Sequence, residues 1–145
     1  LAAGAPVTLT VFSLDAIVVA HTAFESSANY RSAVLSGTAE SLTGTDAEVA
    51  LDLLTDRLVP GRVIEVRSST RREYAATTVL ALPIGEGSWI YKARSGQAGE
   101  PDEETEAWAG IVPLRTVAGL PATDSWVPDA RPVPASVEEL RRRYR

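Results

Sequence analysis

Hydrophobic and polar residues alternate along the first part of the chain, the spacing typical of β-strands whose side chains point to opposite faces in turn. Residues 7–12 alternate and are rich in β-branched side chains, and residues 16–24 form a second apolar segment. A tight connection over residues 13–15 separates the two. Residues 31–40 continue the pattern, with Gly37 marking a bulge or a close approach of the backbone. This part of the chain is therefore predicted to form three strands.

Helical spacing replaces the alternation in the next part of the chain. Apolar residues recur every four positions from Ala50 to Leu58 and so share one face of a helix. Thr45 and Glu48 have the spacing of a capping box, in which each side chain accepts a hydrogen bond from the other residue's backbone N–H. Pro60-Gly61 then predicts the end of this long helix.

Short β-rich segments separated by turns and loops make up much of the second half. The predicted strands are residues 79–84, 88–94 and 108–117, with a turn at Gly85-Glu86-Gly87. The acidic residues 95–106, interrupted by Gly and Pro, predict a mobile loop. Six strands around one long helix predict an antiparallel α+β barrel, mainly β, because a doubly wound sheet would alternate strand and helix.

Two short helices complete the prediction. Ser69-Thr70 provides a cap for a helix over residues 71–76, and Ser136 with Glu139 forms a second capping box that opens a terminal helix. Residues 118–145 otherwise form an extended, Pro-rich tail. The sequence has no internal repeat, and its 145 residues are expected to form a single domain.

The charge of the chain argues against nucleic-acid binding. The net charge is −5, and a nucleic-acid-binding protein would show a clustered basic surface. The basic runs Arg71-Arg72 and Arg141–Arg143 are short and lie next to glutamates. They are typical of a solvated helix face or of a helix C-terminus.

Other classes of protein are excluded by what the sequence lacks. It contains no cysteine, which excludes disulfide scaffolds and thiolate catalysis, and a single histidine, His21, excludes a His-rich metal site within one subunit. No apolar run approaches the ~18 residues that a membrane-spanning helix needs. Residues 1–5 lack the basic flank and apolar core of a signal peptide. We therefore expect a cytoplasmic protein that binds no membrane.

A polar segment, Glu25–Ser32, lies between two of the apolar segments and concentrates hydrogen-bonding side chains. Arg31 offers a bidentate fork to phosphate or carbonyl oxygens, and Tyr30 offers an amphipathic ring. Such a hairpin could form one wall of a site for a planar, anionic ligand. The alternative is structural, with this segment opening a strand and Arg31 paired with Glu25 or Glu40.

Several stretches of the chain resemble one family of proteins, in its order and at about its spacing. The chain resembles the flavin-nucleotide-binding branch of the pyridoxamine-phosphate-oxidase-like split barrels, which is itself similar to nitroimidazole-resistance proteins. The stretches that carry the resemblance are Ala23-Phe24, Ser27–Ser32, Leu58–Arg62, Ala76–Pro83 and Trp108–Leu114.

The resemblance implies a fold, an assembly and a function. The fold is a six-stranded antiparallel split barrel, and the assembly is a homodimer with two FMN sites at the subunit interface. The implied function is that of an FMN-dependent oxidoreductase, in which the flavin carries the hydride or electron chemistry. One alternative is a protein of the same fold that holds FMN, FAD, a deazaflavin, haem or a tetrapyrrole without turnover. Another is a barrel without cofactor that serves as a dimeric interaction domain.

The same resemblance implies the cofactor-binding residues. Asn29, Tyr30, Arg31 and Ser32 match the hairpin stretch that faces the cofactor in this family. Arg31 and Ser32 are expected to contact the flavin or its phosphate, and Asn29 and Tyr30 to lie behind them or on the substrate side. No catalytic residue and no metal ligand is assigned.

The chain also looks shorter than the proteins that it resembles. Those begin with a helix and several strands that include a phosphate-binding loop, whereas this chain opens on Leu1-Ala2-Ala3-Gly4, which is typical of the end of a helix with Gly4 at its C-cap. The chain contains no methionine. We expect the phosphate-binding residues to lie in a part that precedes residue 1.

His21 has two interpretations. It falls within an apolar segment, where a side-chain period of two places it on one face with Ile17 and Val19. A histidine buried in the core or in a subunit interface is the interpretation we favour. A functional His21 would donate a hydrogen bond to the isoalloxazine ring or serve as an axial ligand to haem.

Overall fold

The computed structural model describes residues 4–128 and 131–145, and these divide into two compact units. Unit 1 comprises the residues up to Glu40 together with Leu82–Arg115. Unit 2 comprises Ser41–Ala81 and Thr116–Arg145. The six strands form one sheet of four strands and one of two, and the larger sheet is not closed into a barrel. The predicted mixture of helices and antiparallel strands is confirmed, and a closed six-stranded barrel is not.

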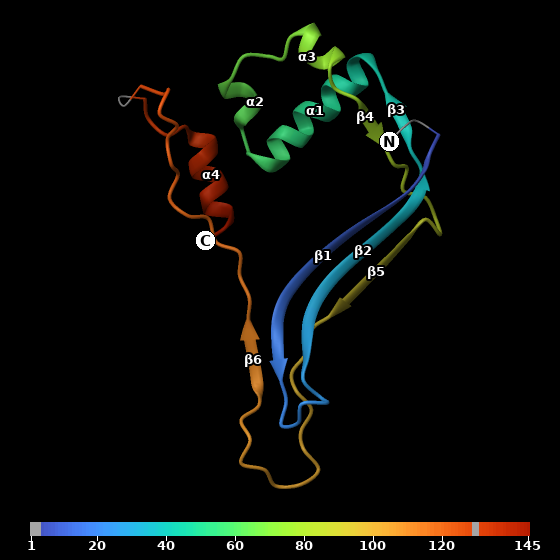
Figure 1. Cartoon of the computed structure of the whole chain (residues 1–145), viewed down its shortest axis with the longest axis vertical. Helices are drawn as coiled ribbons and strands as arrows, with labels where there is room; N and C mark the ends of the chain where they lie inside the picture. Colours follow the sequence, from blue (N-terminus) through green and yellow to red (C-terminus); the bar gives the residue numbers. More distant parts are fainter. Residues whose placement is uncertain (1–3, 129–130) are drawn as a thin grey trace. The chain divides into compact units, whose positions relative to one another are not determined.

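A four-stranded antiparallel sheet forms unit 1, with the strand order β5-β2-β1-β6. Its centre is a long hairpin, with β5 beside β2 and β6 beside the lower part of β1 (Figure 1). The strands are β1 (Pro6–Val19), β2 (Ser27–Thr38), β5 (Trp89–Arg94) and β6 (Gly110–Pro113).

The first strand is longer than predicted. Residues 13–15 were expected to connect two strands, but they continue β1, and the pairing with β2 shifts its register between Leu14 and Ala16. Asp15 is the extra residue of this β-bulge. Its carbonyl oxygen accepts a hydrogen bond from the Leu114 backbone N–H, 2.9 Å away. A bulge accommodates one extra polar residue without ending the strand, which is why the prediction of a break was wrong.

The hairpin turn also lies elsewhere than predicted. β1 ends at Val19 rather than continuing to Phe24, whose side chain is 97% exposed. The connection is held by side chains: Ser26 Oγ accepts from the Ala20 N–H at 3.1 Å. Because β2 already begins at Ser27, the predicted site residues lie within a strand and not in a polar elbow.

The buried part of unit 1 is small and lies mostly toward the turn end of the hairpin, with Ala39 buried near the other end. Val18 is 1% exposed, and its neighbours Ala16 and Ala20 are also buried. Farther along the sheet, Gly37 approaches another segment closely, as its sequence context predicted. A Cβ atom on Gly37 would lie 2.9 Å from Leu82 Cδ1. Large apolar side chains elsewhere on the sheet remain exposed, namely Leu9, Val11, Phe12, Leu14, Ile17, Trp89, Ile90, Tyr91 and Val112.

Unit 2 is mainly helical. It contains β3 (Glu40–Leu42) from Ser41 onward, α1 (Gly44–Leu58), α2 (Arg62–Glu65), α3 (Arg71–Ala75), β4 (Val79–Ala81) and α4 (Ala135–Arg143). The long helix ends before Pro60-Gly61, as predicted, with Val59 as its C-cap. Its predicted capping box is wrong, because Thr43 is the N-cap and makes no side-chain cap hydrogen bond. The short helix α2 was not predicted.

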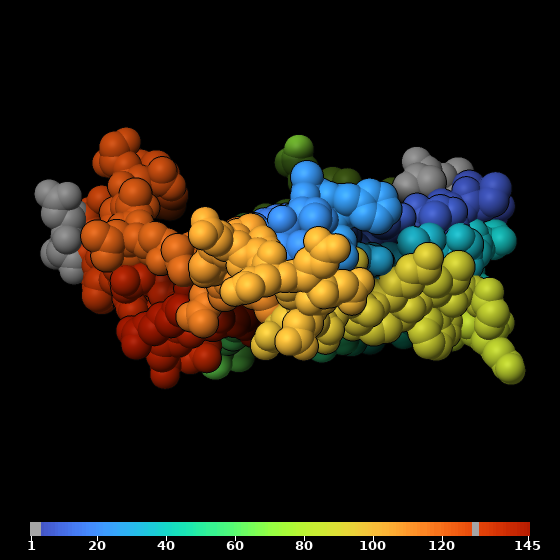
Figure 2. Space-filling view, turned by 90° about the horizontal axis from the view of Figure 1, so that it is seen from below, coloured from blue at the N-terminus to red at the C-terminus, as the bar shows by residue number. Residues whose placement is uncertain are grey.

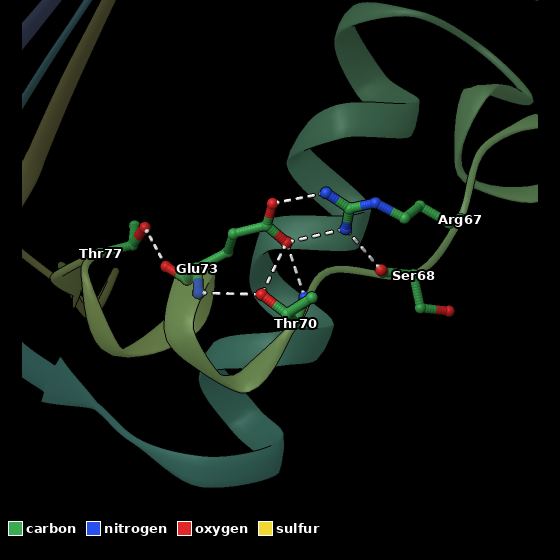
Figure 3. A network of polar contacts seen from close by, with 5 residues as sticks. All are labelled: Arg67, Ser68, Thr70, Glu73 and Thr77. Carbon is green, nitrogen blue, oxygen red and sulfur yellow. Dashed lines mark hydrogen bonds and ion pairs between the residues drawn. The ribbon is translucent and has the colours of Figure 1, made fainter.

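The cap predicted at the start of α3 is confirmed, with Thr70 as the N-cap, and Glu73 completes a capping box that was not predicted. Thr70 Oγ1 accepts from the Glu73 N–H at 3.3 Å, and Glu73 Oε2 accepts from the Thr70 N–H at 2.7 Å (Figure 3). Arg67 adds a bidentate pair, with Nη2 donating to Glu73 Oε1 at 2.6 Å and Nη1 to Oε2 at 2.9 Å. These contacts lower the pKa of Glu73 to about 2, with the hydrogen bond from Arg67 as the largest cause.

The terminal helix begins differently from its prediction. Its N-cap is Pro134, which makes no side-chain cap hydrogen bond. The backbone N–H and the hydroxyl of Ser136 both donate to the carboxylate of Glu65, and Glu139 pairs with Arg142 at 2.7 Å. Ser136 is 2% exposed, so the predicted local capping box is replaced by a contact between segments distant in sequence.

Replacing Glu73 with glutamine is expected to remove a pH-dependent contribution to stability. A carboxylate with a lowered pKa in the folded state stabilises the fold fully above its unfolded value of 4.5, and this contribution is lost as pH falls toward about 2. The stability difference between wild type and Glu73→Gln should therefore shrink between about pH 5 and pH 2. Thermal denaturation across this range measures it. A constant difference would contradict the prediction, and Glu86→Gln, at an exposed turn, serves as the control.

Candidate functional site

The four predicted cofactor-binding residues all lie in β2, but they do not share one face of the sheet. Side chains alternate along a strand, so Asn29 and Arg31 point to one face and Tyr30 and Ser32 to the other. The side chains of Arg31 and Ser32, which the resemblance implied as joint contacts to the cofactor, therefore point to opposite faces, although both residues border the depression on the Arg31 face.

The Arg31 face carries a shallow, open depression of about 230 Å³. Its lining residues come from the three adjacent strands β1, β2 and β5, and they are Val11, Ser13, Arg31, Ser32, Ala33 and Tyr91. The registers place Val11 and Tyr91 directly opposite Ala33, one on each side. The floor is thus apolar, with an aromatic side chain at one edge and a guanidinium at another.

Arg31 is held by Asp15, the residue of the β-bulge. Arg31 Nε donates to Asp15 Oδ2 at 2.9 Å and Nη2 donates to Oδ1 at 2.8 Å, a bidentate pair. The Ser13 hydroxyl also donates to Oδ1 at 2.9 Å. The hydrogen bond from Arg31 lowers the pKa of Asp15 and, reciprocally, that from Asp15 raises the pKa of Arg31.

The pairing of Arg31 with Asp15 was not predicted. The predicted structural alternative, a pair between Arg31 and Glu25 or Glu40, is wrong, because the partner of Arg31 is Asp15. A signal was present in the sequence, since Ser13 and Asp15 interrupt a long apolar alternation. Only the strand register, with Ser13 directly opposite Arg31, brings these groups together.

Asn29 anchors a loop. It is 7% exposed, and its Nδ2 donates to the backbone oxygen of Gly96 at 2.9 Å. Its Oδ1 is buried and has no hydrogen-bond partner among the described residues. In the view from below, the hairpin end lies beside the loop between β5 and β6 (Figure 2). Asn29 therefore has a structural role, holding the start of this loop against the sheet.

The other face of the sheet is aromatic and basic. The rings of Phe12 and Tyr30 lie 5.9 Å apart at an angle of 30°. On the neighbouring strand, Lys92 is directly opposite Ser32, and Arg94 is directly opposite Tyr30. Neither Lys92 nor Arg94 forms an ion pair with any residue that the structure describes.

His21 lies just beyond the end of β1, in the hairpin connection. Its Nε2 pairs with Glu25 Oε2 at 2.9 Å, and its side chain is 17% exposed. Its Nδ1 is buried and has no partner among the described residues. A carboxylate on one ring nitrogen is the usual companion of a metal-bound histidine. In this arrangement, however, neither nitrogen is open to an iron, so haem ligation would require the imidazole to reorient.

The depression is too small and too open to enclose a ligand by itself. Pockets for small molecules usually enclose about 300–1,000 Å³ and bury most of the ligand. The depression is smaller and open, so the described residues supply a single wall. An apolar floor, an aromatic edge and a guanidinium suit a flat ring system that carries carbonyl oxygens.

Two further classes of site find no support within residues 4–128 and 131–145. No group of three or more His, Cys, Asp or Glu side chains could hold a metal ion there. No helix in these ranges is long and apolar enough to cross a membrane.

Comparison with known proteins places these features in a family. The family model of pyridoxamine 5'-phosphate oxidase matches residues 1–90. The structure of the FAD and heme binding protein from Mycobacterium smegmatis has 46% sequence identity and a TM-score of 0.90, over 95% of this chain and 68% of that one. The flavocytochrome Anf3 from Azotobacter vinelandii has 29% identity and a TM-score of 0.80, over 93% of this chain and 64% of that one. No curated protein matched. The chain belongs to the pyridoxamine 5'-phosphate oxidase family.

Proposed function

We propose that this protein binds a flavin, with the isoalloxazine ring against the depression beside Arg31. The observation that carries the proposal is its similarity to the FAD and heme binding protein from Mycobacterium smegmatis, at 46% identity over 95% of the chain. The depression supports it, because its apolar floor and its guanidinium suit a flat heteroaromatic ring.

The proposed activity is that of a flavin-dependent oxidoreductase. A bound flavin supplies hydride or electron transfer. The residues of the chain bind and orient the ring: Val11 and Ala33 offer an apolar surface, Tyr91 an aromatic edge, and Arg31 hydrogen-bond donors. The family resemblance favours FMN as the flavin, whereas the name of the Mycobacterium smegmatis protein favours FAD.

We further propose that the protein acts as a homodimer. One chain supplies one wall of the site, and the sheet that carries it leaves large apolar side chains such as Phe12, Trp89 and Ile90 exposed. Exposed apolar surface on this scale is typical of a protein interface. A second copy would cover part of this surface and complete the cofactor site.

A cytoplasmic location stays a prediction.

Haem binding is the second candidate. The name of one similar protein includes heme, and the other is a flavocytochrome. His21 also has a carboxylate partner, as metal-bound histidines usually do. In this form the protein would hold its cofactor for binding or electron transfer rather than for substrate turnover. The enclosed Nδ1 of His21 is the observation that speaks against ligation in the present arrangement.

An absorbance spectrum of the full-length protein as purified tests both candidates. Flavin bands are expected, and chromatography of the released cofactor then distinguishes FMN from FAD. A Soret band that is lost in His21→Ala would establish haem binding through His21. A colourless protein that takes up neither added FMN nor added FAD would refute the flavin proposal. Light scattering on the same sample gives the solution mass, and a monomeric mass would refute the homodimer.

A further inference from the structure

We infer that Arg31 recognises the neutral, carbonyl-bearing edge of the flavin ring and does not bind the phosphate of the cofactor, because Asp15 already neutralises its charge. This inference rests on the proposed flavin binding and assigns Arg31 its role in that site. It narrows the expectation from the family resemblance, which left ring and phosphate open.

The pairing with Asp15 uses one edge of the guanidinium and leaves the other edge free. Arg31 has five N–H donors, and Asp15 takes those of Nε and one of Nη2. The two donors of Nη1 and the second donor of Nη2 have no short contact with any residue that the structure describes; only the Ser13 hydroxyl, at 3.5 Å, comes near Nη2. Because the Arg31 side chain is 60% exposed, these donors are open to a ligand.

The ion pair is fixed by the backbone, which sets it apart from an ordinary surface pair. Exposed ion pairs are generally weak because two long side chains must be ordered. Here Asp15 is short, it lies in a β-bulge whose carbonyl oxygen is bonded to the Leu114 N–H, and Ser13 bonds its carboxylate. Arg31 is therefore preoriented, and its partner does not move away when a ligand arrives.

The charge balance disfavours a phosphate at this point. The guanidinium and the carboxylate sum to zero, so a phosphate at the free edge of Arg31 would gain little net attraction. It would also lie above the apolar floor formed by Val11 and Ala33, whose side chains offer a hydrated anion no hydrogen-bond donor. Carbonyl oxygens and ring nitrogens of a neutral ring need only aligned N–H donors, and the planar fork provides those.

Riboflavin and FMN differ only in the phosphate, so their relative affinities decide between the two roles. We expect Arg31→Gln to lower the affinity for riboflavin and the affinity for FMN by the same factor, about tenfold. A loss of this size is expected when hydrogen bonds from a charged donor are removed. Arg31→Lys should lower both affinities nearly as much, because lysine keeps the charge but lacks the planar fork of donors. Fluorescence titration of each flavin measures this, and the absorption bands of bound riboflavin should shift in both variants.

The control is Arg94→Gln, which removes an exposed arginine on the opposite face of the same sheet and should leave riboflavin affinity unchanged. A loss of FMN affinity in Arg31→Gln with riboflavin affinity unchanged, and with Arg31→Lys close to wild type, would overturn the inference in favour of a phosphate contact. A wild-type protein that binds neither riboflavin, FMN nor FAD would instead refute the proposed function itself.

Discussion

Asn29→Asp is expected to destabilise the protein by about 3 kcal/mol at pH 7, the cost of burying a carboxylate that faces an acceptor. Asn29 is 7% exposed, and its Nδ2 is the donor to the Gly96 carbonyl oxygen. Aspartate has the same shape but places a charged acceptor against that oxygen. Chemical denaturation measures the free energy of unfolding of the two proteins.

The loss of stability in Asn29→Asp should become smaller as the pH is lowered. Burial raises the pKa of a carboxyl group, and the protonated form could again donate to the Gly96 oxygen. The stability of Asn29→Asp should therefore approach that of wild type as the pH is lowered below the raised pKa. The matched control is Gln97→Glu, the same change of amide to carboxylate at an exposed position of the same loop, which should cost little. A difference that does not depend on pH would contradict the assignment of Asn29 as the anchor of this loop.

Val18→Ala is expected to cost about 2 kcal/mol of folding free energy, from the transfer of the lost methyl groups and from the cavity they leave. Val18 is 1% exposed and lies in β1 directly opposite Ser27 of β2, and it is the largest side chain that is fully buried among the described residues. The small core at the turn end of the hairpin depends on it more than on any neighbour. Thermal or chemical denaturation in the absence of flavin provides the measurement.

The same substitution elsewhere in β1 provides the control. Val11 is 56% exposed, so Val11→Ala should change the free energy of unfolding by less than about 0.5 kcal/mol. Equal losses of folding free energy in the two variants would show that the burial of Val18 within one chain does not determine how much this side chain stabilises the protein. In that case Val11 would be covered in solution, as a homodimer that buries this face of the sheet would require.

Local chemistry predicted the elements that depend on neighbouring residues. The predicted cap of α3 formed at Thr70, because its partner, the backbone of Glu73, lies within one turn of the same helix. The end of α1 before Pro60-Gly61 was predicted for a similar reason, since proline cannot continue the hydrogen-bonding pattern. The capping box predicted for Ser136 failed because Glu65, a residue distant in sequence, offered the same N–H a carboxylate.

The strands were located less well than the helices. Alternation of side chains identified β1 and β2, but it could not distinguish a break at residues 13–15 from a bulge. Hydrogen bonds across strands decide that difference, and residues far apart in the chain make them. The predicted strands 79–84 and 108–117 shortened to Val79–Ala81 and Gly110–Pro113 for the same reason, since a strand extends only as far as its partner pairs with it.

By itself, the sequence determined the class of fold, the family resemblance, and the segment in which the candidate site lies. These follow from local spacing and residue type, which every stretch carries with it. Tertiary structure alone decided that Arg31 and Ser32 point to opposite faces of the sheet, and that Asp15 neutralises Arg31. Both depend on the register between strands, because a shift of one residue moves every side chain to the other face.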